Sequence, residues 1–545
     1  MKIAIQGVPD PVQNGIAQGW KVFHAGLLTE SETIECDVVI VGTGAGGGTA
    51  AEILTKAGLS VVMLEEGPLR SSNDFRMNEG EAFRDLYQEG GGRTSNDGAL
   101  TILQGRAVGG STTVNWTSSF RTPEPTLQHW QSVHGLQAFS AEAMAPWFEM
   151  AERRVNIGPW QVPPNANNDV LRAGCEQLGW SWDSIPRNVS GCWNLGYCGV
   201  GCPTNAKQSM LVTTIPAALT GGAKLYQRAK VREIIMEGDT VVGVVADGMP
   251  EKGFTPTGHT LTVRARHTIL AGGAINNPGI LLRSKAPNPH RQVGANTTIH
   301  PTVANFAVFD KDIQGWHGSP QSIYSDHFQW QDGATGPTGF KLEVMPMLPA
   351  FVASLLGTHG AAHAEEMTQL GQLNGMIALV RDGFTEDAMG GTVELRKNGS
   401  PVLDYDLKSG HVDAIRRSFL AMSEIQFAAG ARQVRPAQLG GGTFTSWNEC
   451  KEAINNFSIE KFRTLVGSAH LMGGCVMGNN PKTSVVTDQG RYHLLDQLSI
   501  MDGSLFPTSI GANPQLSIYG LVSKLATQLA NELAPNGALN AAVVS

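Results

Sequence analysis

Two side chains in the C-terminal part of the 545-residue chain could together carry acid–base chemistry, namely His470 and Asn513. A neutral imidazole, whose unperturbed pKa is about 6.5, can accept a proton from a substrate at neutral pH. The carboxamide of asparagine can hold a substrate oxygen by hydrogen bonding without competing for that proton. A single histidine is more often a structural residue than a catalyst, so the chemistry depends on elements that bring a substrate to these side chains.

The first such element begins with an apolar run at residues 38–41 and continues into a glycine-rich turn with the spacing G-x-G-x-x-G. Residues 49–54 then form a predicted helix, and a second apolar run at residues 60–64 ends in Glu65. This strand–helix–strand unit is typical of dinucleotide binding, because the glycines let the backbone approach a pyrophosphate at the N-terminus of the helix. Glu65, about 20 residues after the glycines, is placed to accept hydrogen bonds from both ribose hydroxyls. The alternative is a purely structural glycine turn; the predicted cofactor contacts are Gly42, Gly44, Ala45, Gly46, Gly47 and Glu65.

A second glycine-rich stretch lies at residues 105–116 and has no helical or strand periodicity. Small residues in such a stretch indicate backbone pressed against a ligand. An ordinary glycine loop would explain this stretch equally well if it stood alone. Two such loops in one chain favour an extended cofactor.

A third feature is the cluster formed by Cys192, Cys198 and Cys202. Thiolates ligate iron–sulfur clusters and zinc, but this spacing is not the usual C-x2-C. The sequence favours structural thiols or one disulfide, with an iron–sulfur cluster and then zinc as the alternatives, so we predict no metal site. The seven cysteines of the chain are too few and too scattered for a secreted disulfide scaffold.

Charge and hydropathy narrow the class of protein. The formal net charge of −8 and the lack of a Lys/Arg run argue against a nucleic-acid partner. No run of 18 apolar residues predicts a transmembrane segment, and the N-terminus lacks the pattern of a signal peptide. We therefore expect a cytoplasmic protein, with peripheral membrane contact as the alternative. Residues 11–27 could form a short amphipathic arm, which we expect to pack on the body of the protein.

The strand–helix–strand unit, the loop at 105–116 and the segments around His470 and Asn513 together resemble the glucose–methanol–choline (GMC) oxidoreductase family. Residues 109–116, followed by Phe-Arg-Thr-Pro at 120–123, are most similar to the long-chain alcohol oxidase branch of that family. The resemblance implies that the cofactor is FAD, that His470 is the catalytic base and that Asn513 is the second catalytic residue. Some members bind the flavin covalently through a histidine of the second loop. Residues 105–116 contain no histidine, so we expect non-covalent FAD.

The resemblance also implies further contacts with FAD. The loop at 105–116 would run beside the flavin ring, the backbone at Val231 would pair with the adenine, and Asp502 with its neighbour would contact the phosphate and ribityl region. We expect Asn513 and the proline after it to start a helix that continues to about residue 533, with its positive end favouring the reduced flavin. The contacts implied in addition to those of the first loop are Arg106, Gly109, Gly110, Thr113, Asn115, Trp116, Val231, Ala271, Gly272, Asp502, Gly503, Asn513 and Pro514.

We expect an α/β fold, α+β overall, with a Rossmann-like FAD-binding domain and a substrate-binding domain in which helices cover a β-sheet. Strands are predicted at residues 302–309 and 376–380, and a helix at 412–429 from its apolar spacing. The Met-rich stretch at 345–356 could line a substrate tunnel, but core packing is the favoured interpretation. The expected boundaries are 31–125, 205–300 and 465–545 for the FAD-binding domain, 126–204 and 301–464 for the substrate-binding domain, and 1–30 for the N-terminal arm.

The resemblance therefore predicts an FAD-dependent oxidoreductase that converts an alcohol CH–OH group to an aldehyde or ketone, with proton abstraction by His470 and hydride transfer to flavin N5. The expected substrate is an apolar alcohol, and the expected electron acceptor is oxygen, a quinone or a cytochrome. The alternatives are a flavin-containing lyase and a dehydrogenase that passes electrons through a cysteine-bound iron–sulfur cluster. A NAD(P)-linked dehydrogenase would need only the first glycine loop, and a catalytically silent flavin-binding protein would not need His470.

Overall fold

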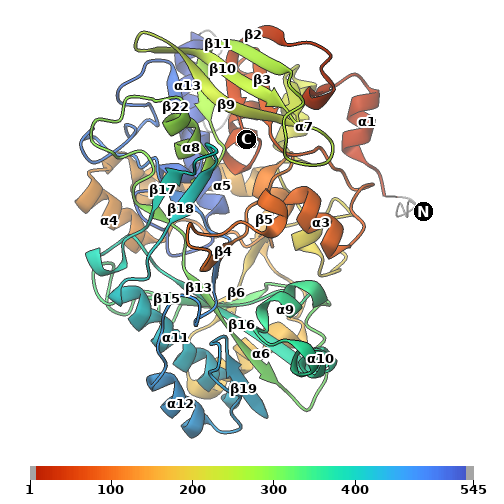
Figure 1. The fold of residues 1–545 in the computed structure, drawn as a ribbon, viewed down its shortest axis with the longest axis vertical. Coiled ribbons are helices and arrows are strands. Elements are labelled where there is room, and N and C mark those ends of the chain that lie inside the picture. The colour runs from red at the N-terminus through yellow and green to blue at the C-terminus, as the bar shows by residue number, and fades with distance from the viewer. Residues whose placement is uncertain (1–7, 536–545) are drawn as a thin grey trace.

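The computed structural model describes residues 8–535, which contain two large β-sheets at opposite ends of the molecule (Figure 1). In the view of Figure 1 the first sheet lies at the top, and the second lies in the lower half with several helices around it. Residues 1–7, which begin the predicted arm, and residues 536–545 lie outside the described residues.

The first sheet is built around the predicted glycine unit. Strand β2 (Glu32–Val41) runs into the glycine turn, helix α2 (Ala45–Lys56) follows, and β3 (Val61–Glu65) returns parallel to β2. Every residue of β3 is buried, as expected of a central parallel strand that is covered on both faces. The Rossmann-like prediction is confirmed by the strand order β1 (Lys21–His24), β8 (Lys224–Gln227), β3, β2, β11 (Thr260–Leu270), β10 (Thr240–Gly248) and β9 (Ala229–Glu237), with β22 (Leu498–Ile500) beside β11.

Parallel pairing brings distant segments to one edge of this sheet. Strands β3, β2, β11 and β22 are parallel neighbours, so their carboxyl ends lie side by side. Ligands of open α/β sheets bind at this edge. The segments that follow these four strands are the glycine turn at 42–47, the acidic pair at 65–66, the turn at 271–273 and the turn at 502–503.

The last long helix, α13 (Gln515–Leu533), packs against α2 and α5 (Ala141–Arg154), and it ends where the sequence predicts. Its start differs from the prediction. Pro514 occupies the N-cap position, no side chain caps the helix, and Asn513 lies one residue earlier. The predicted cap is wrong because the Asn513 carboxamide is held by Glu343, to which its Nδ2 donates at 3.2 Å, and its Oδ1 accepts from no N–H of the helix.

The second sheet has the order β4 (Leu100–Ile102), β20 (Val466–Ser468), β13 (Thr302–Val308), β16 (Leu373–Val380), β15 (Phe340–Val344), β14 (Ile323–Ser325) and β6 (Asp183–Ser184), with β19 (Gln433–Pro436) also paired to β13. Helix α11 (Ser409–Ala428) packs on β13 and β16 and contacts α6 (Ala166–Leu178) and α12 (Trp447–Asn455). The predicted strands at 302–309 and 376–380 and the predicted helix at 412–429 are therefore present. Met345 and Met347 are buried in an apolar cluster of this region, which agrees with the core interpretation of that stretch.

The N-terminal segment is joined to the first sheet. Helix α1 (Pro11–Ala17) is capped by the Asp10 carboxylate, and β1 pairs in parallel with β8 at the sheet edge. Among residues 8–535, no helix has the length and apolar character needed to cross a membrane. The other elements are α3 (Glu79–Leu86), α4 (Glu124–His134), β5 (Ile157–Pro159), β7 (Pro186–Asn188), α7 (Thr214–Thr220), α8 (Asn276–Arg283), β12 (Thr297–Thr298), α9 (Pro349–Leu355), α10 (Gly360–Thr368), β17 (Thr392–Leu395), β18 (Pro401–Asp404) and β21 (Met472–Gly473).

Candidate active site

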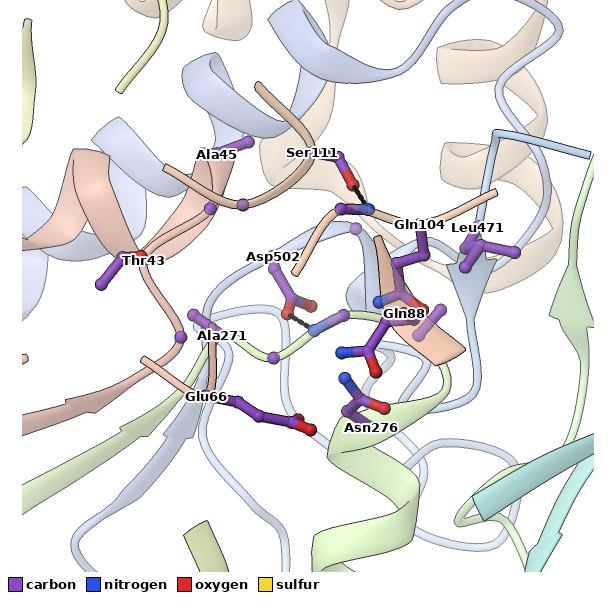
Figure 2. A pocket seen from close by; sticks show the side chains of 18 of the residues that line it. Thr43, Ala45, Glu66, Gln88, Gln104, Ser111, Ala271, Asn276, Leu471 and Asp502 are labelled. Atoms are coloured by element: carbon purple, nitrogen blue, oxygen red, sulfur yellow. Dashed lines mark hydrogen bonds between the residues drawn. The ribbon is translucent and has the colours of Figure 1, made fainter. Parts of the chain in front are cut away.

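A cavity of about 760 Å³ lies at the carboxyl edge of the first sheet. Figure 2 shows residues of its wall: Glu66, Ala271 and Asp502 come from this edge, and Gln88 and Gln104 come from the segment before the second loop. Its volume is within the range of small-molecule and cofactor sites. The predicted site residues that line it are Gly42, Gly44, Ala45, Gly46, Glu65, Gly110, Asn115, Trp116, Val231, Ala271, Gly272, His470, Asp502, Gly503, Asn513 and Pro514. The other predicted contacts, which do not line it, are Gly47, Arg106, Gly109 and Thr113.

The two glycine loops meet at Gly44 and Gly110. A Cβ on Gly110 would lie 2.5 Å from the Cα of Gly44, so this approach requires glycine in the second loop. A Cβ on Gly44 would meet no protein atom closer than 3.7 Å, so the space beside it is open. Gly44 is also the N-cap of α2, and no side chain caps the first N–H groups of that helix. An open space beside uncapped helical N–H groups fits the pyrophosphate of a dinucleotide such as FAD.

The two glutamates at the end of β3 differ in their contacts with the protein. Both oxygens of Glu65 accept from the protein: Oε2 accepts from the N–H and hydroxyl of Thr43 at 3.1 and 2.7 Å, and Oε1 accepts from the Gly67 N–H at 2.9 Å. The neighbouring Glu66 carboxylate lies in the cavity wall in Figure 2. Sequence reasoning missed Glu66, although a second acid directly after Glu65 was a visible signal. Both carboxylates are therefore candidates to bind the ribose.

Cationic side chains surround Glu66. Its Oε1 atom lies 3.3 Å from Lys230 Nζ and 3.3 Å from Arg106 Nε. Burial opposes ionisation of Glu66, but Lys230, Arg106 and Arg93 together hold its pKa down at about 2. Arg106 therefore acts from behind the wall by fixing a carboxylate that lines it.

Asp502 joins two of the turns at the sheet edge. Its Oδ2 accepts from the Gly273 N–H at 2.6 Å and from Asn277 Nδ2 at 2.9 Å, and its Oδ1 accepts from the Ser504 N–H at 2.8 Å and the Ser504 hydroxyl at 2.5 Å. Figure 2 shows its bond to the turn after β11. Burial raises the pKa of Asp502, which the four donors around the carboxylate counteract. Asp502 thus holds the predicted cofactor-binding turns in register.

His470 also lines the cavity and is half-buried. Its Nδ1 atom is 3.1 Å from the Nδ1 atom of the buried His300, while its Nε2 atom makes no hydrogen bond to any residue in the 8–535 range. Burial, and to a lesser degree the cation of Lys341, lowers the pKa of His470 to about 4. The imidazole is therefore neutral at pH 7.

Asn513 lines the same cavity from the segment before α13. Its Nδ2 donates to Glu343, and its Oδ1 is buried with no hydrogen-bond partner in the described part of the chain. Glu343 also accepts from Gln321 at 3.1 Å, and its other oxygen lies 3.7 Å from Lys341 Nζ. Burial raises the pKa of Glu343 and lowers that of Lys341. An unpartnered acceptor beside the cavity fits a ligand that donates a hydrogen bond.

Three buried residues behind the predicted pair were missed: His300, Lys341 and Glu343. No motif surrounds His300 in the sequence. Lys341 and Glu343 are two charged residues in the short strand β15, all of whose residues are buried, and a charged pair in an apolar strand is a signal that could have been used.

The cysteine cluster lies behind the second glycine loop. Cys192, Cys198 and Cys202 are free thiols, and Cys198 Sγ lies 3.6 Å from Arg187 Nη2. The described residues contain no group of three or more His, Cys, Asp or Glu side chains placed to hold a metal ion. The buried Lys207 links the cluster to the loop, because its Nζ donates to the carbonyls of Cys198, Thr113 and Asn115 at 2.6, 2.9 and 2.6 Å.

Comparison with known proteins finds similar sequences among oxidoreductases. The family model described as GMC oxidoreductase matches residues 83–302 and 388–521. The long-chain-alcohol oxidase FAO4B of Arabidopsis thaliana is 31% identical over 528 residues, which cover 92% of this chain and 68% of that protein. An uncharacterized GMC-type oxidoreductase, y4nJ of Sinorhizobium fredii, is 30% identical over 507 residues, which cover 92% of this chain and 95% of that protein.

Solved structures share the fold. Pyridoxine 4-oxidase from Mesorbium loti has a TM-score of 0.66 at 18% identity, with 90% of this chain and 99% of that chain covered. A formate oxidase of Aspergillus oryzae RIB40, solved to study FAD modification, has a TM-score of 0.65 at 13% identity, with 93% and 100% covered. The two family-model matches and the coverage of the relatives establish that this chain belongs to the GMC oxidoreductase family.

Proposed function

We propose that this protein oxidises the CH–OH group of an alcohol to an aldehyde or ketone, with His470 as the proton acceptor and Asn513 as the second group that binds the alcohol oxygen. As a GMC oxidoreductase, it is an FAD-dependent oxidoreductase that acts on CH–OH donors. The observation that carries the proposal is that His470 and Asn513 line the same cavity as the two glycine loops.

The chain would hold FAD without a covalent bond. Among the described residues that line the cavity, His470 is the one histidine and there is no cysteine. The glycine turn would hold the pyrophosphate, and Glu65 or Glu66 would hold the ribose. Bound FAD supplies the two-electron acceptor for the hydrogen on the alcohol carbon.

The residues of the chain prepare the alcohol for that reaction. His470 leaves Nε2 as the ring atom without a protein partner, and this atom can take the hydroxyl proton once the ring's own hydrogen lies on Nδ1. The second N–H of the Asn513 carboxamide, beside the one donated to Glu343, can donate to the alcohol oxygen and so restricts the rotation of the bound hydroxyl without competing for its proton. A neutral imidazole beside Lys341 also avoids placing two positive charges in one buried site.

The substrate we propose is an apolar primary or secondary alcohol, oxidised with oxygen as the electron acceptor. Two observations support it: relatives named as long-chain-alcohol oxidases, and the apolar side chains of Trp116 and Leu471 in the cavity wall. Ser118 and Gln321 line the same end of the cavity, and their polar groups bond to each other at 3.1 Å. A polar substrate would have to compete with that bond.

Anaerobic reduction of the purified yellow protein tests the function. Long-chain primary alcohols should bleach the bound flavin, and heat or acid should release FAD into the supernatant. Reoxidation by oxygen, by a quinone analogue and by cytochrome c should then be compared, with oxygen fastest. A flavin that no alcohol bleaches, while a substrate is cleaved without net oxidation, would favour a lyase instead. Stoichiometric iron would favour transfer through a cysteine-bound cluster.

A further inference from the structure

The buried His300 is held in a strained backbone conformation directly behind His470. Its φ of 47° lies in the left-handed region, which side chains other than glycine rarely adopt. The Asp382 carboxylate secures this conformation, because Oδ1 accepts from the His300 N–H at 3.1 Å and Oδ2 accepts from the Ile299 N–H at 2.8 Å. The Tyr405 hydroxyl in turn donates to Asp382 at 2.8 Å. Strain that the surroundings enforce in this way is typical of functional sites.

The hydrogen bonds of His300 determine where its proton lies. The Gly511 N–H donates to His300 Nε2 at 3.1 Å, so that nitrogen is an acceptor and carries no hydrogen. A neutral His300 must then carry its hydrogen on Nδ1. The Nδ1 atom of His470 is 3.1 Å away and accepts that hydrogen, which leaves the hydrogen of a neutral His470 on Nε2.

We propose that His300 is a positioning residue that selects the protonation state of His470, holding it neutral with its hydrogen on the cavity-facing Nε2. The proposal rests on the proposed function, because it concerns the residue to which that function assigns proton transfer. In the free protein His470 is accordingly a hydrogen-bond donor to the alcohol oxygen, and the unpartnered Asn513 Oδ1 is an acceptor for the alcohol hydrogen.

His300 consequently controls when His470 can accept a proton. A base at Nε2 requires the His470 hydrogen to lie on Nδ1, where it must be donated to His300 Nδ1. His300 would then carry its hydrogen on Nε2, facing the Gly511 N–H, and that hydrogen bond would be lost. A doubly protonated His470 meets the same conflict, so His300 opposes the positive charge as well.

Other ionisable groups within residues 8–535 lie near the two imidazoles, but none of them hydrogen-bonds to the His470 ring as His300 does. The Lys341 cation on β15 disfavours protonation of both rings. Glu343 on the same strand is bonded to Asn513 and Gln321 and paired with Lys341. Asp382 bonds the backbone of His300, and its contacts are not with either ring.

The test uses the FAD-loaded His300→Asn protein and compares the pH dependence of anaerobic flavin reduction with that of the wild type. A carboxamide can occupy the place of His300 Nδ1 and can rotate to donate or to accept, so it suits every protonation state of His470. The acid limb of the rate profile should therefore move up by at least one pH unit, and the rate at high pH should be retained or increased. The matched control is His267→Asn, which removes another buried imidazole, on β11 outside the cavity. It should lower the melting temperature without moving the acid limb.

A direct readout is the 15N spectrum of histidine-labelled holoenzyme, in which the wild-type His470 should show hydrogen on Nε2 and the His300→Asn protein a mixture of tautomers. An unchanged acid limb in a folded, FAD-loaded His300→Asn protein would overturn the proposal. A His470→Ala protein that reduces FAD at the wild-type rate would instead overturn the proposed function. The two failures are thus distinguishable.

Discussion

At the scale of single residues, burial in a polar pocket sets the chemistry of His470. The imidazole is neutral because desolvation and the nearby Lys341 both oppose its positive charge. A buried neighbour also orients Asn513: its Nδ2 donates to Glu343, and its Oδ1 has no partner in the described part of the chain. His470 and Asn513 thus each have a buried partner, His300 and Glu343 respectively.

Replacement of His470 by alanine should slow anaerobic flavin reduction by about 10²- to 10⁴-fold, the usual contribution of a positioned general base. Stopped-flow spectroscopy of the FAD-loaded variant gives this rate. Asn513→Ala is the comparison and should lose a smaller factor, because it removes a hydrogen-bond partner and leaves the proton acceptor. If His470→Ala with full FAD occupancy stays within a few-fold of wild type, His470 is not the base.

The wild-type rate should stay constant from pH 8 down to about 5 and fall only near the pKa of about 4 that burial gives His470. Below that pH the imidazole is protonated and cannot accept the hydroxyl proton. Stopped-flow reduction in a series of buffers measures this limb. A fall centred near the ordinary histidine pKa of about 6.5 would show that His470 is not desolvated in the loaded enzyme.

At the scale of elements, two glycines at the start of α2 are required for different physical reasons. Gly47, in the first turn of α2, packs against the turn that precedes the helix, where a Cβ would collide with the Gly42 carbonyl oxygen. Gly44 has open space beside it on the cavity side. One glycine therefore serves the fold and the other serves the ligand.

Gly44→Ala should give a folded protein that binds FAD at least tenfold more weakly, because the added methyl group occupies space reserved for the cofactor. Exchange of glycine for alanine at an N-cap costs about 1 kcal/mol of helix stability, which is too little to unfold the protein. Gly47→Ala is the contrasting variant and should fold poorly even with excess FAD. Circular dichroism reports folding, and fluorescence titration of the apoprotein reports affinity. Normal FAD affinity in Gly44→Ala would place the pyrophosphate elsewhere.

Lys207 connects the cysteine cluster to the second glycine loop, so its replacement should loosen both. Lys207→Met would leave three carbonyls without this donor, one of them buried, and a buried group left unsatisfied costs about 1–3 kcal/mol. The melting temperature and the FAD content should both fall, as thermal unfolding and absorbance would show. Lys482→Met, at an exposed loop position, is the control and should change neither. Unaltered FAD content in Lys207→Met would mean that the loop holds its shape independently.

At the scale of the whole molecule, the site exists because the polypeptide crosses between two sheets several times. β4 and β20 belong by sequence to segments assigned to the FAD-binding domain, yet they pair within the second sheet. In the first sheet, β9 is the edge strand beside β10, and its residue Val231 lies in the cavity wall. The cavity is therefore enclosed by chain segments that are far apart in the sequence.

Acid should destabilise the whole protein well before its ordinary carboxylates are protonated. Burial lowers the pKa values of His267, His411 and His470 to about 4, while unfolding restores the ordinary value of about 6.5. The unfolded state then binds more protons between these pH values, so stability falls as the pH drops from 6.5 toward 4, by roughly 1 kcal/mol per pH unit for each imidazole. Asp382, whose pKa burial raises to about 6, offsets one of the three.

Thermal unfolding of the holoenzyme between pH 7 and 4.5 measures this effect, and the melting temperature should decline steadily over that range. His267→Asn should flatten the decline, because it removes one of the buried imidazoles. A melting temperature that is independent of pH down to 5 would mean that these histidines are protonated in the folded protein.

The sequence by itself determined the features that depend on local spacing. Burial in a parallel sheet requires apolar runs such as residues 38–41, and the turn after this strand requires glycine, so the dinucleotide unit could be predicted from a short window. The helix α11 and the C-terminal end of α13 could be predicted as well, because the apolar spacing of a helix is also a local pattern. His470 and Asn513 were identified through the resemblance to the family to which the chain belongs, and their roles remain a prediction.

Only the tertiary structure decided which groups stand behind that pair. His300 and His470 are 170 positions apart, and so are Glu343 and Asn513. Contacts over such separations depend on how the sheets pack, and no local spacing encodes them. The same reason explains why the cap predicted at Asn513 is wrong. A helix start is a local signal, but the carboxamide is held by the buried Glu343 carboxylate of the second sheet, and its oxygen accepts from no N–H of the helix.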